Sequence, residues 1–169
     1  PDFLKISSAS RVSSASRVSS GAPNGSLIMV GGGKDSAVTL ELLKNIPGPK
    51  TALLLNPTPA AIKTTGVAGY ESIVVRRTID PKLLELNKNG ALNGHTPFSA
   101  YLAFLGTLVA AIHGYKYIIA SNESSASEGN VEYMGKTINH QYSKSFDFEK
   151  KFRERPGLSA SKGQAFCNI

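Results

Sequence analysis

The stretch SLIMVGGGKDS, residues 26–36, joins an apolar run to a glycine-rich turn. The apolar residues up to Val30 predict a buried β-strand, which the glycines end. Residues 36–44 then have apolar side chains at helical spacing, and Pro47 supplies a stop signal. The stretch therefore predicts a strand, a glycine loop and a helix in succession.

The same alternation continues along the chain. Further buried strands are predicted at residues 51–55, 73–75 and 115–120, and a long core helix at residues 97–112. Thr96 and Pro97 are typical of a helix start, and His113 followed by Gly114 is typical of a helix end. Strands that alternate with helices indicate an α/β fold, a parallel sheet flanked by helices. In such sheets ligands bind at the carboxyl ends of the strands.

The glycine loop, residues 31–36, has the composition of a phosphate site. Glycines let the backbone approach a phosphate closely, and a helix start offers N–H groups and a positive dipole end to an anion. Lys34 adds a cation and Ser36 a hydroxyl. The spacing fits neither a Walker A loop, because Asp35 follows the lysine, nor the dinucleotide fingerprint. A plain glycine turn capped by Asp35 or Ser36 is the alternative, and the combination favours phosphate binding.

Other polar clusters lie near the predicted strand ends. NGHTPFS (93–99) opens the long helix, SNE (121–123) leaves the last predicted strand, and NHQYSKSF (139–146) follows after a loop. Each cluster alone is compatible with helix capping or a surface turn. Because strand ends of a parallel sheet meet at one edge, their joint placement favours a functional site.

The loop Gly32-Gly33-Lys34-Asp35-Ser36 resembles the PP-loop of N-type ATP pyrophosphatases, whose pattern is Ser-Gly-Gly-x-Asp-Ser. Gly31 stands where the pattern has Ser, so one hydroxyl is absent. The resemblance implies a Rossmann-like fold of the adenine-nucleotide alpha-hydrolase type. It also implies cleavage of ATP to AMP and diphosphate.

Two downstream strings resemble the family of UDP-N-acetylmuramoyl-L-alanyl-L-glutamate epimerases: LNGHTPFSAYLAFLGTLVAAIHGYKYIIASNESSAS (92–127) and INHQYSKSFDFEKKFR (138–153). The resemblance covers roughly residues 26–155. It implies an ATP- and Mg²⁺-dependent inversion of the terminal L-Glu of UDP-MurNAc-L-Ala-L-Glu to D-Glu through an acyl-adenylate. Adenylation removes the carboxylate charge, so a base can take the α-proton and an acid can return one to the opposite face. Because members of this family are considerably longer, we expect an incomplete enzyme.

The resemblance implies a nucleotide site and a metal site in these motifs. The nucleotide-binding candidates lie at strand ends: Gly32, Gly33, Lys34, Asp35, Ser36 and Asn122. Asp35 and Glu123 are the candidates for Mg²⁺, which takes one or two carboxylates beside phosphate oxygens.

The catalytic candidates are His95, His140, Tyr142 and Lys144. The two histidines are the proton-transfer candidates because histidine titrates near neutral pH. Lys144 and Tyr142 would stabilise an enolate-like intermediate. His113, at a predicted helix end, is interpreted as a cap that complements the helix dipole.

Composition excludes several classes of protein. The 169 residues have a net charge of +7 and a single cysteine, Cys167, which excludes a disulfide scaffold, a cysteine-built zinc site and a two-thiol racemase. No apolar run reaches the roughly 18 residues of a membrane-spanning helix. Lysine and arginine are scattered, so we expect no nucleic-acid partner, and we expect no membrane partner either. The family resemblance implies a UDP-linked muramoyl dipeptide as substrate and a cytoplasmic location. Nothing in the sequence predicts the oligomeric state.

The two ends are predicted to differ from the catalytic domain at residues 26–155. Residues 1–25 contain SSASRV twice in tandem and are predicted to be disordered. Their Ser/Arg richness also resembles a transit peptide, which leaves an organellar location as an alternative, and a cloning or partial-sequence artefact as another. Residues 156–169 are predicted to form an irregular, truncated tail.

Two alternative functions remain open at the level of sequence. One is another adenylating PP-loop enzyme, either an amidotransferase-type synthetase or a tRNA-modifying enzyme. The other is an ATP-binding fragment without catalysis.

Overall fold

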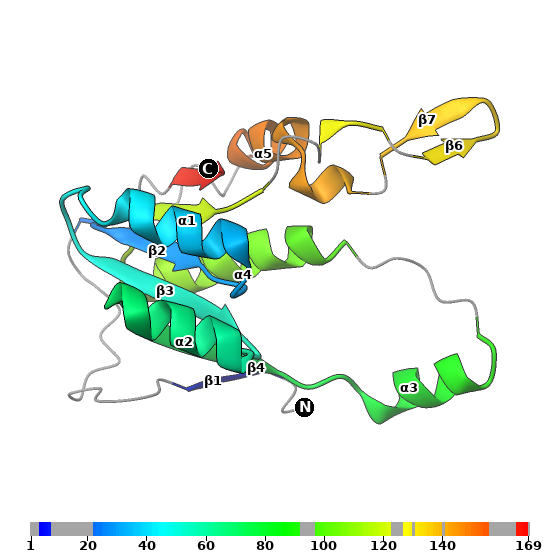
Figure 1. The fold of residues 1–169 in the computed structure, drawn as a ribbon. Coiled ribbons are helices and arrows are strands. Elements are labelled where there is room, and N and C mark those ends of the chain that lie inside the picture. Colours follow the sequence, from blue (N-terminus) through cyan, green and yellow to red (C-terminus); the bar gives the residue numbers. More distant parts are fainter. Residues whose placement is uncertain are drawn as a thin grey trace.

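The computed structural model describes residues 4–7, 22–91, 97–122, 127–129, 131–139, 141–155 and 165–168. Its centre is a six-stranded sheet in the order β1-β4-β3-β2-β5-β8 (Figure 1). The strands are β1 Leu4–Ser7, β2 Ser26–Met29, β3 Lys50–Leu55, β4 Glu71–Arg77, β5 Tyr117–Ala120 and β8 Ala165–Asn168. Neighbouring strands pair in parallel except β1, which pairs with β4 in the antiparallel sense.

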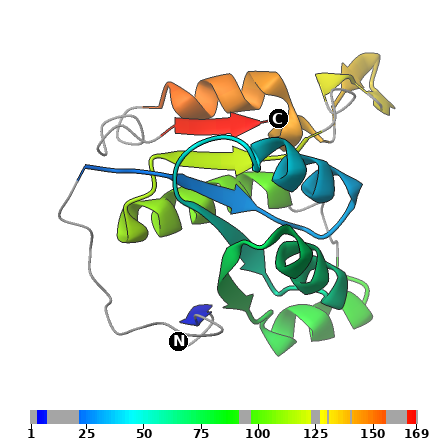
Figure 2. The ribbon, with the colours of Figure 1, turned by 60° about the vertical axis from the view of Figure 1, so that its left-hand side comes forward.

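Helices cover both faces of this sheet (Figures 1 and 2). One face packs against α1 Lys34–Leu43 and α2 Pro59–Ala68. The other packs against α4 Phe98–His113 and α5 Phe146–Arg153, which the 3-10 turn η2 Tyr142–Lys144 precedes. The helix α3 Pro81–Lys88 and the hairpin of β6 Val131–Tyr133 and β7 Lys136–Ile138 project away from the sheet. The predicted α/β fold, a parallel sheet flanked by helices, is confirmed.

The alternation of side chains along each strand divides the core into two halves. Leu53 belongs to the cluster under α4 and α5, whereas its neighbour Leu54 belongs to the cluster under α1 and α2. In β2, Leu27 and Ile28 divide in the same way, and both are fully buried. Because successive side chains point to opposite faces, a strand covered on both sides must be apolar throughout. This explains why the central strands are continuous apolar runs.

The predicted strands and the long helix are confirmed, whereas the sequence analysis did not predict α2 and α3. Thr58 caps α2 by accepting a hydrogen bond from the Ala61 N–H at 3.2 Å, and Gly69 ends this helix with φ +77°. Asp80 caps α3 in a similar way, since its side chain accepts from the Lys82 N–H at 2.8 Å. Both helices begin with a capping residue followed by proline, a start signal that the sequence displays.

Both ends of the chain contribute edge strands. The strand β1 lies in the segment predicted to be disordered, and β8, which includes Cys167, lies in the segment predicted to be an irregular tail. For these two strands the prediction is wrong, because a sheet edge supplies backbone partners that a local sequence pattern does not reveal. The domain limits of 26 and 155 stay a prediction. Within the described ranges, no helix is long and apolar enough to cross a membrane.

Candidate functional site

A pocket of about 400 Å³ opens at the carboxyl edge of the sheet. It lies among the glycine loop after β2, the residues after β5 and η2 before α5, together with parts of β3 and α4. The lining comprises Met29, Val30, Gly31, Gly33, Asp35, Ser36, Leu53, Leu55, Phe98, Ser99, Leu102, Ala120, Ser121, Asn122, Ser143 and Lys144. The polar strand ends that the sequence predicts to meet are therefore brought together.

The pocket has chemically different walls. Leu53, Leu55 and Phe98 contribute apolar surface from β3 and α4. Asp35 and Lys144 contribute opposite charges from α1 and η2. A pocket with one apolar and one polar wall suits a ligand that joins an apolar group to charged ones.

The N-terminus of α1 has no side-chain cap. Its N-cap is Gly33, which has no side chain and makes no capping hydrogen bond. The first-turn N–H groups of a helix have no partner within the helix and lie at the positive end of its dipole. A Cβ added at Gly33 would have no atom within 4 Å, so the space beside it is free of protein atoms.

Ser36 braces the glycine loop from within. Its Oγ accepts hydrogen bonds from the N–H of Gly31 at 3.0 Å and of Gly32 at 3.3 Å. The Ser36 side chain is buried in the pocket wall. Because the hydroxyl accepts from two amides, its own proton is available for donation to an anion in the pocket.

Gly32 faces α2. Its φ is +89°, and a Cβ there would lie 2.6 Å from the Ala61 backbone nitrogen. Only glycine fits a position that combines a left-handed backbone with such close packing. Neither Gly32 nor Lys34 is among the residues that line the pocket.

Asn122 is positioned through its neighbour. Thr39 of α1 is buried, and its Oγ1 lies 2.7 Å from Ser121 Oγ at the end of β5. This hydrogen bond holds the segment after β5 against the helix whose N-terminus opens into the pocket. Ser121 and Asn122 consequently line the same pocket as Asp35.

Lys144 is positioned by a helix cap. Ser145, the N-cap of α5, accepts a hydrogen bond from the Phe148 N–H at 3.2 Å and donates one to the Tyr142 carbonyl at 2.7 Å. The Ser145 side chain is buried. Lys144 Nζ also donates to Gln141 Oε1 at 3.1 Å, so its ammonium group is held at the pocket.

The chain matches a known protein family over most of its length. Residues 2–166 match the family model of the MurL N-terminal domain. The chain belongs to the MurL N-terminal domain family.

Relatives of this MurL N-terminal domain chain are named UDP-N-acetyl-alpha-D-muramoyl-L-alanyl-L-glutamate epimerase. The relative from Salinispora tropica is 38% identical over 137 residues, which cover 79% of this chain and 30% of the relative. The relative from Xanthomonas oryzae pv. oryzae is 34% identical over 127 residues, which cover 75% of this chain and 28% of the relative. The chain thus spans 28% to 30% of the length of these two proteins.

One solved structure gives a weaker match. It is described as a predicted subunit of tRNA methyltransferase from Methanocaldococcus jannaschii, with 14% identity and a TM-score of 0.41 over 85% of this chain and 68% of that one.

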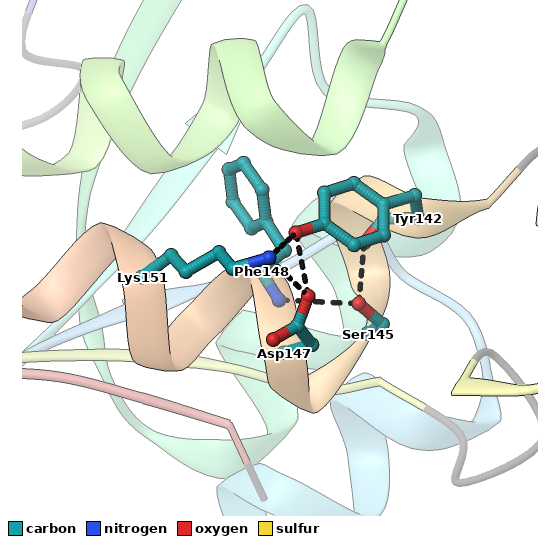
Figure 3. A network of polar contacts seen from close by, with 5 residues as sticks. All are labelled: Tyr142, Ser145, Asp147, Phe148 and Lys151. Atoms are coloured by element: carbon teal, nitrogen blue, oxygen red, sulfur yellow. Dashed lines mark hydrogen bonds and ion pairs between the residues drawn. The ribbon is translucent and has the colours of Figure 1, made fainter.

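Within this MurL N-terminal domain, the Tyr142 hydroxyl lies away from the pocket that Lys144 lines. The Tyr142 hydroxyl donates to Asp147 Oδ2 at 2.7 Å and accepts from Lys151 Nζ at 3.1 Å, and Lys151 also contacts Asp147 at 2.8 Å (Figure 3). The hydrogen bond from Lys151, and then that from Tyr142, holds the pKa of Asp147 below its usual value. The Asp147 hydrogen bond raises the pKa of Lys151. The structure does not bring the Tyr142 hydroxyl into the pocket, although Ser143 and Lys144 line it.

The remaining predicted site residues include three that lie outside the described residues: His95, Glu123 and His140. Among the described ranges, no group of three or more His, Cys, Asp or Glu side chains could hold a metal ion. Asp35 alone fits Mg²⁺ that is bound mainly through nucleotide phosphates, since one or two carboxylates are usual there.

Asn56, which ends β3, has a structural role instead of lining the site. Its side chain accepts from the Arg77 N–H and donates to the Arg77 carbonyl, both at 2.7 Å. The sequence analysis placed Phe98 and Ser121 in polar clusters near strand ends but did not name them as site residues, and it did not single out Thr39. The tertiary structure shows that Phe98 and Ser121 line the pocket and that Thr39 bonds to Ser121.

Proposed function

We propose that this chain is the ATP-binding part of an enzyme that inverts the terminal L-Glu of UDP-MurNAc-L-Ala-L-Glu to D-Glu. The reaction would consume ATP and release AMP and diphosphate. Membership of the MurL N-terminal domain family and the names of the relatives support the substrate and the epimerisation. The observation that supports ATP binding is that the α1 N-terminus, Asn122 and Lys144 line one common pocket. A UDP-linked precursor is consistent with a cytoplasmic reaction.

In this proposal the phosphates of ATP lie between α1 and η2. The first-turn N–H groups of α1 and the ammonium group of Lys144 would bind phosphate oxygens. The Ser36 hydroxyl would donate to the same group. Asp35 would hold Mg²⁺ together with phosphate oxygens, and the metal would supply neutralisation of their charge.

The chemistry needs an activated carboxylate. The adenylyl group of ATP would pass to the α-carboxylate of the glutamyl residue, with diphosphate as the leaving group. Loss of the carboxylate charge makes the α-proton acidic enough for a base such as a histidine near neutral pH, and we propose His95 and His140 for the proton transfers. Hydrolysis of the acyl-adenylate then yields AMP and the epimerised product. The apolar wall of Leu53, Leu55 and Phe98 would limit access of water before inversion.

The ATP assignment is tested by calorimetric titration of the chain with ATP and Mg²⁺. Replacing Lys144→Met should weaken binding by about tenfold or more, because a hydrogen bond to a charged group contributes about 1.5–3 kcal/mol. Lys82→Met is the matched control, since Lys82 lies on α3 in an exposed ion pair with Glu85. Absence of saturable ATP binding by the unaltered chain would refute the proposal.

The reaction itself is tested with ATP, Mg²⁺ and UDP-MurNAc-L-Ala-L-Glu, followed by chiral analysis of the glutamate after acid hydrolysis. AMP together with D-Glu supports the epimerase. AMP without D-Glu indicates a different acceptor. If the chain binds ATP without forming AMP while the full-length Salinispora tropica relative forms AMP and D-Glu, the catalytic steps require parts outside this chain.

A further inference from the structure

Arg77 is the last residue of β4, and its side chain reaches the pocket-lining residue Phe98. Its guanidinium carbon is 5.2 Å from the ring centroid of Phe98 and 5.7 Å from that of Tyr101, both on the first turn of α4. The two rings stack at 6.0 Å with an interplanar angle of 22°. Phe98 also lines the pocket, so the guanidinium group and the pocket share one aromatic wall.

Two polar atoms in this cluster have unmet hydrogen-bonding capacity. Within the part of the chain that the structure describes, Arg77 Nε and Tyr101 Oη are buried and have no hydrogen-bond partner. Buried polar side-chain atoms are nearly always paired, and an unpaired one costs about 1–3 kcal/mol. The contact cluster of Arg77 and Tyr101 therefore holds two polar groups that can still donate to an additional acceptor.

The cluster is held firmly in place. The Asn56 side chain bonds to both the N–H and the carbonyl of Arg77 at 2.7 Å, while the Asn56 N–H bonds to the Val75 carbonyl at 2.9 Å. Leu55, the residue before Asn56, lines the pocket. The backbone of Arg77 is thus fixed to the strand that forms the apolar wall, which pre-organises its side chain for binding.

The available groups select an anion. Arg77 supplies an N–H donor on a permanently charged, planar group, and Tyr101 supplies an O–H donor. Among the described residues no carboxylate forms an ion pair with Arg77. Arginine pairs with the oxygens of carboxylates and phosphates through short, charge-assisted hydrogen bonds. Contact with the aromatic rings stabilises the cation without occupying its donors.

We propose that Arg77 and Tyr101 form an anion subsite beside the pocket and bind an anionic oxygen group of the substrate. The identity of that substrate rests on the proposed function, because UDP-MurNAc-L-Ala-L-Glu offers both glutamyl carboxylates and a diphosphate. The subsite lies on the Phe98 side of the pocket, whereas ATP is assigned to the α1 side. It therefore accounts for a substrate group that the nucleotide site does not bind.

The direct test observes the Arg77 side-chain N–H by nuclear magnetic resonance. The arginine Nε–H signal that disappears in Arg77→Met identifies the group. Separate titrations of the unaltered chain with the dipeptide L-Ala-L-Glu and with UDP should shift this signal downfield and saturably with one of the two. A shift with the dipeptide indicates that the subsite binds a carboxylate, and a shift with UDP indicates that it binds a phosphate. A signal that stays unchanged with both probes overturns the proposal.

Variants provide the second test. Arg77→Met keeps a long apolar stem against the rings, and Tyr101→Phe removes only the hydroxyl. Each substitution should lower the affinity for the probe that shifts the Arg77 signal. Arg77→Met should lower it by about tenfold or more, because a charged hydrogen bond is lost. Arg76→Met is the matched control, because Arg76 is exposed on the same strand and its loss changes the net charge equally. Equal affinities for Arg77→Met and Arg76→Met would overturn the proposal. If Arg77→Met does not fold, Tyr101→Phe and Arg77→Lys carry the comparison.

Parallel ATP titrations separate this subsite from the proposed function. Arg77→Met should leave ATP affinity within about twofold of the unaltered chain. Binding of a probe at Arg77 by a chain that does not bind ATP would sustain the subsite and refute the proposed function. If ATP binds normally but neither Arg77→Met nor Tyr101→Phe changes the affinity for the probes, the subsite is refuted and the proposed function is not.

Discussion

Thr39 Oγ1 of α1 and Ser121 Oγ after β5 lie 2.7 Å apart, although the two residues are separated by 82 positions. Thr39 is buried, and Ser121 lines the pocket beside Asn122. This hydrogen bond links the helix that opens into the pocket to the strand end that supplies its opposite polar wall. The geometry of the pocket therefore depends on a contact between two small side chains.

Replacing Thr39→Val tests this link. The change keeps the shape but leaves the Ser121 hydroxyl without its partner, which should lower the free energy of unfolding by about 1–3 kcal/mol. Because Ser121 precedes Asn122, ATP affinity should also fall. Urea denaturation and ATP titration measure the two effects.

The control for this change is Thr65→Val in α2. Thr65 is equally buried, but its hydroxyl donates to the Ala61 carbonyl of its own helix at 2.9 Å and does not reach the pocket. This variant should leave ATP affinity unchanged. A loss of ATP affinity in both variants would mean that the Thr39–Ser121 contact has no special role.

Adjacent glycines in the loop should respond differently to alanine. Gly32→Ala forces a Cβ at φ +89° to within 2.6 Å of the Ala61 nitrogen, so the chain should lose several kcal/mol of stability (about 1–2 kcal/mol from the left-handed backbone alone). The Cβ of Gly33→Ala would meet no atom within 4 Å, and φ at this position is −87°. The free energy of unfolding of this variant should therefore differ from that of the unaltered chain by no more than about 0.5 kcal/mol. Since Gly33 lines the pocket, its new methyl group should instead weaken ATP binding. Similar stabilities of the two variants would contradict the packing of Gly32 against α2.

The elements that the sequence predicted well are those with strong local signals. The apolar run at Leu27 and Ile28 and the glycines after it fix β2, the loop and α1 without reference to the rest of the chain. The meeting of strand ends in one pocket was also predictable, because parallel strands place their carboxyl ends on one edge.

The elements that escaped prediction depend on partners far along the chain. The strand β1 exists because Leu4 and its neighbours pair with Arg77 and the rest of β4. Tyr142 was a catalytic candidate because it lies in a polar cluster, yet its hydroxyl bonds to Asp147 and Lys151 of α5. The direction of a side chain near a motif is set by packing, which residue spacing alone does not specify.

The cap of α5 connects stability to the site. Ser145→Ala removes the acceptor for the Phe148 N–H and the donor to the Tyr142 carbonyl. Loss of a buried N-cap should cost about 1–2 kcal/mol and loosen η2, so that Lys144 is less well held at the pocket. Thermal unfolding should show a lower midpoint, and ATP affinity should fall.

A cap on another helix provides the comparison for Ser145→Ala. Asp80→Ala removes the cap of α3, a helix without buried residues. It should fray that helix while leaving both the unfolding midpoint and ATP affinity nearly unchanged. Equal effects of the two substitutions would show that α5 does not couple to the pocket.

The exposed network of Tyr142, Asp147 and Lys151 predicts a pH effect with a definite sign. Lys151 and Tyr142 lower the pKa of Asp147 from its ordinary 3.8, so the network stabilises the chain above that pH and loses this contribution as pH falls through the lowered pKa. On the basic side Lys151, with its raised pKa, keeps its charge up to and beyond its ordinary 10.5.

Tyr142→Phe removes one of the two hydrogen bonds to Asp147, so the Asp147 pKa should rise toward its ordinary value while staying below it, because Lys151 remains. Titration of the Asp147 side-chain carboxyl carbon by nuclear magnetic resonance measures this shift. Tyr133→Phe, on the exposed strand β6, is the control and should leave the Asp147 pKa unchanged. ATP affinity should also be unchanged in Tyr142→Phe, because the hydroxyl contacts α5 and not the pocket. A clear loss of ATP binding in Tyr142→Phe, with no shift of the Asp147 pKa, would instead indicate that the Tyr142 hydroxyl contacts the ligand in the pocket.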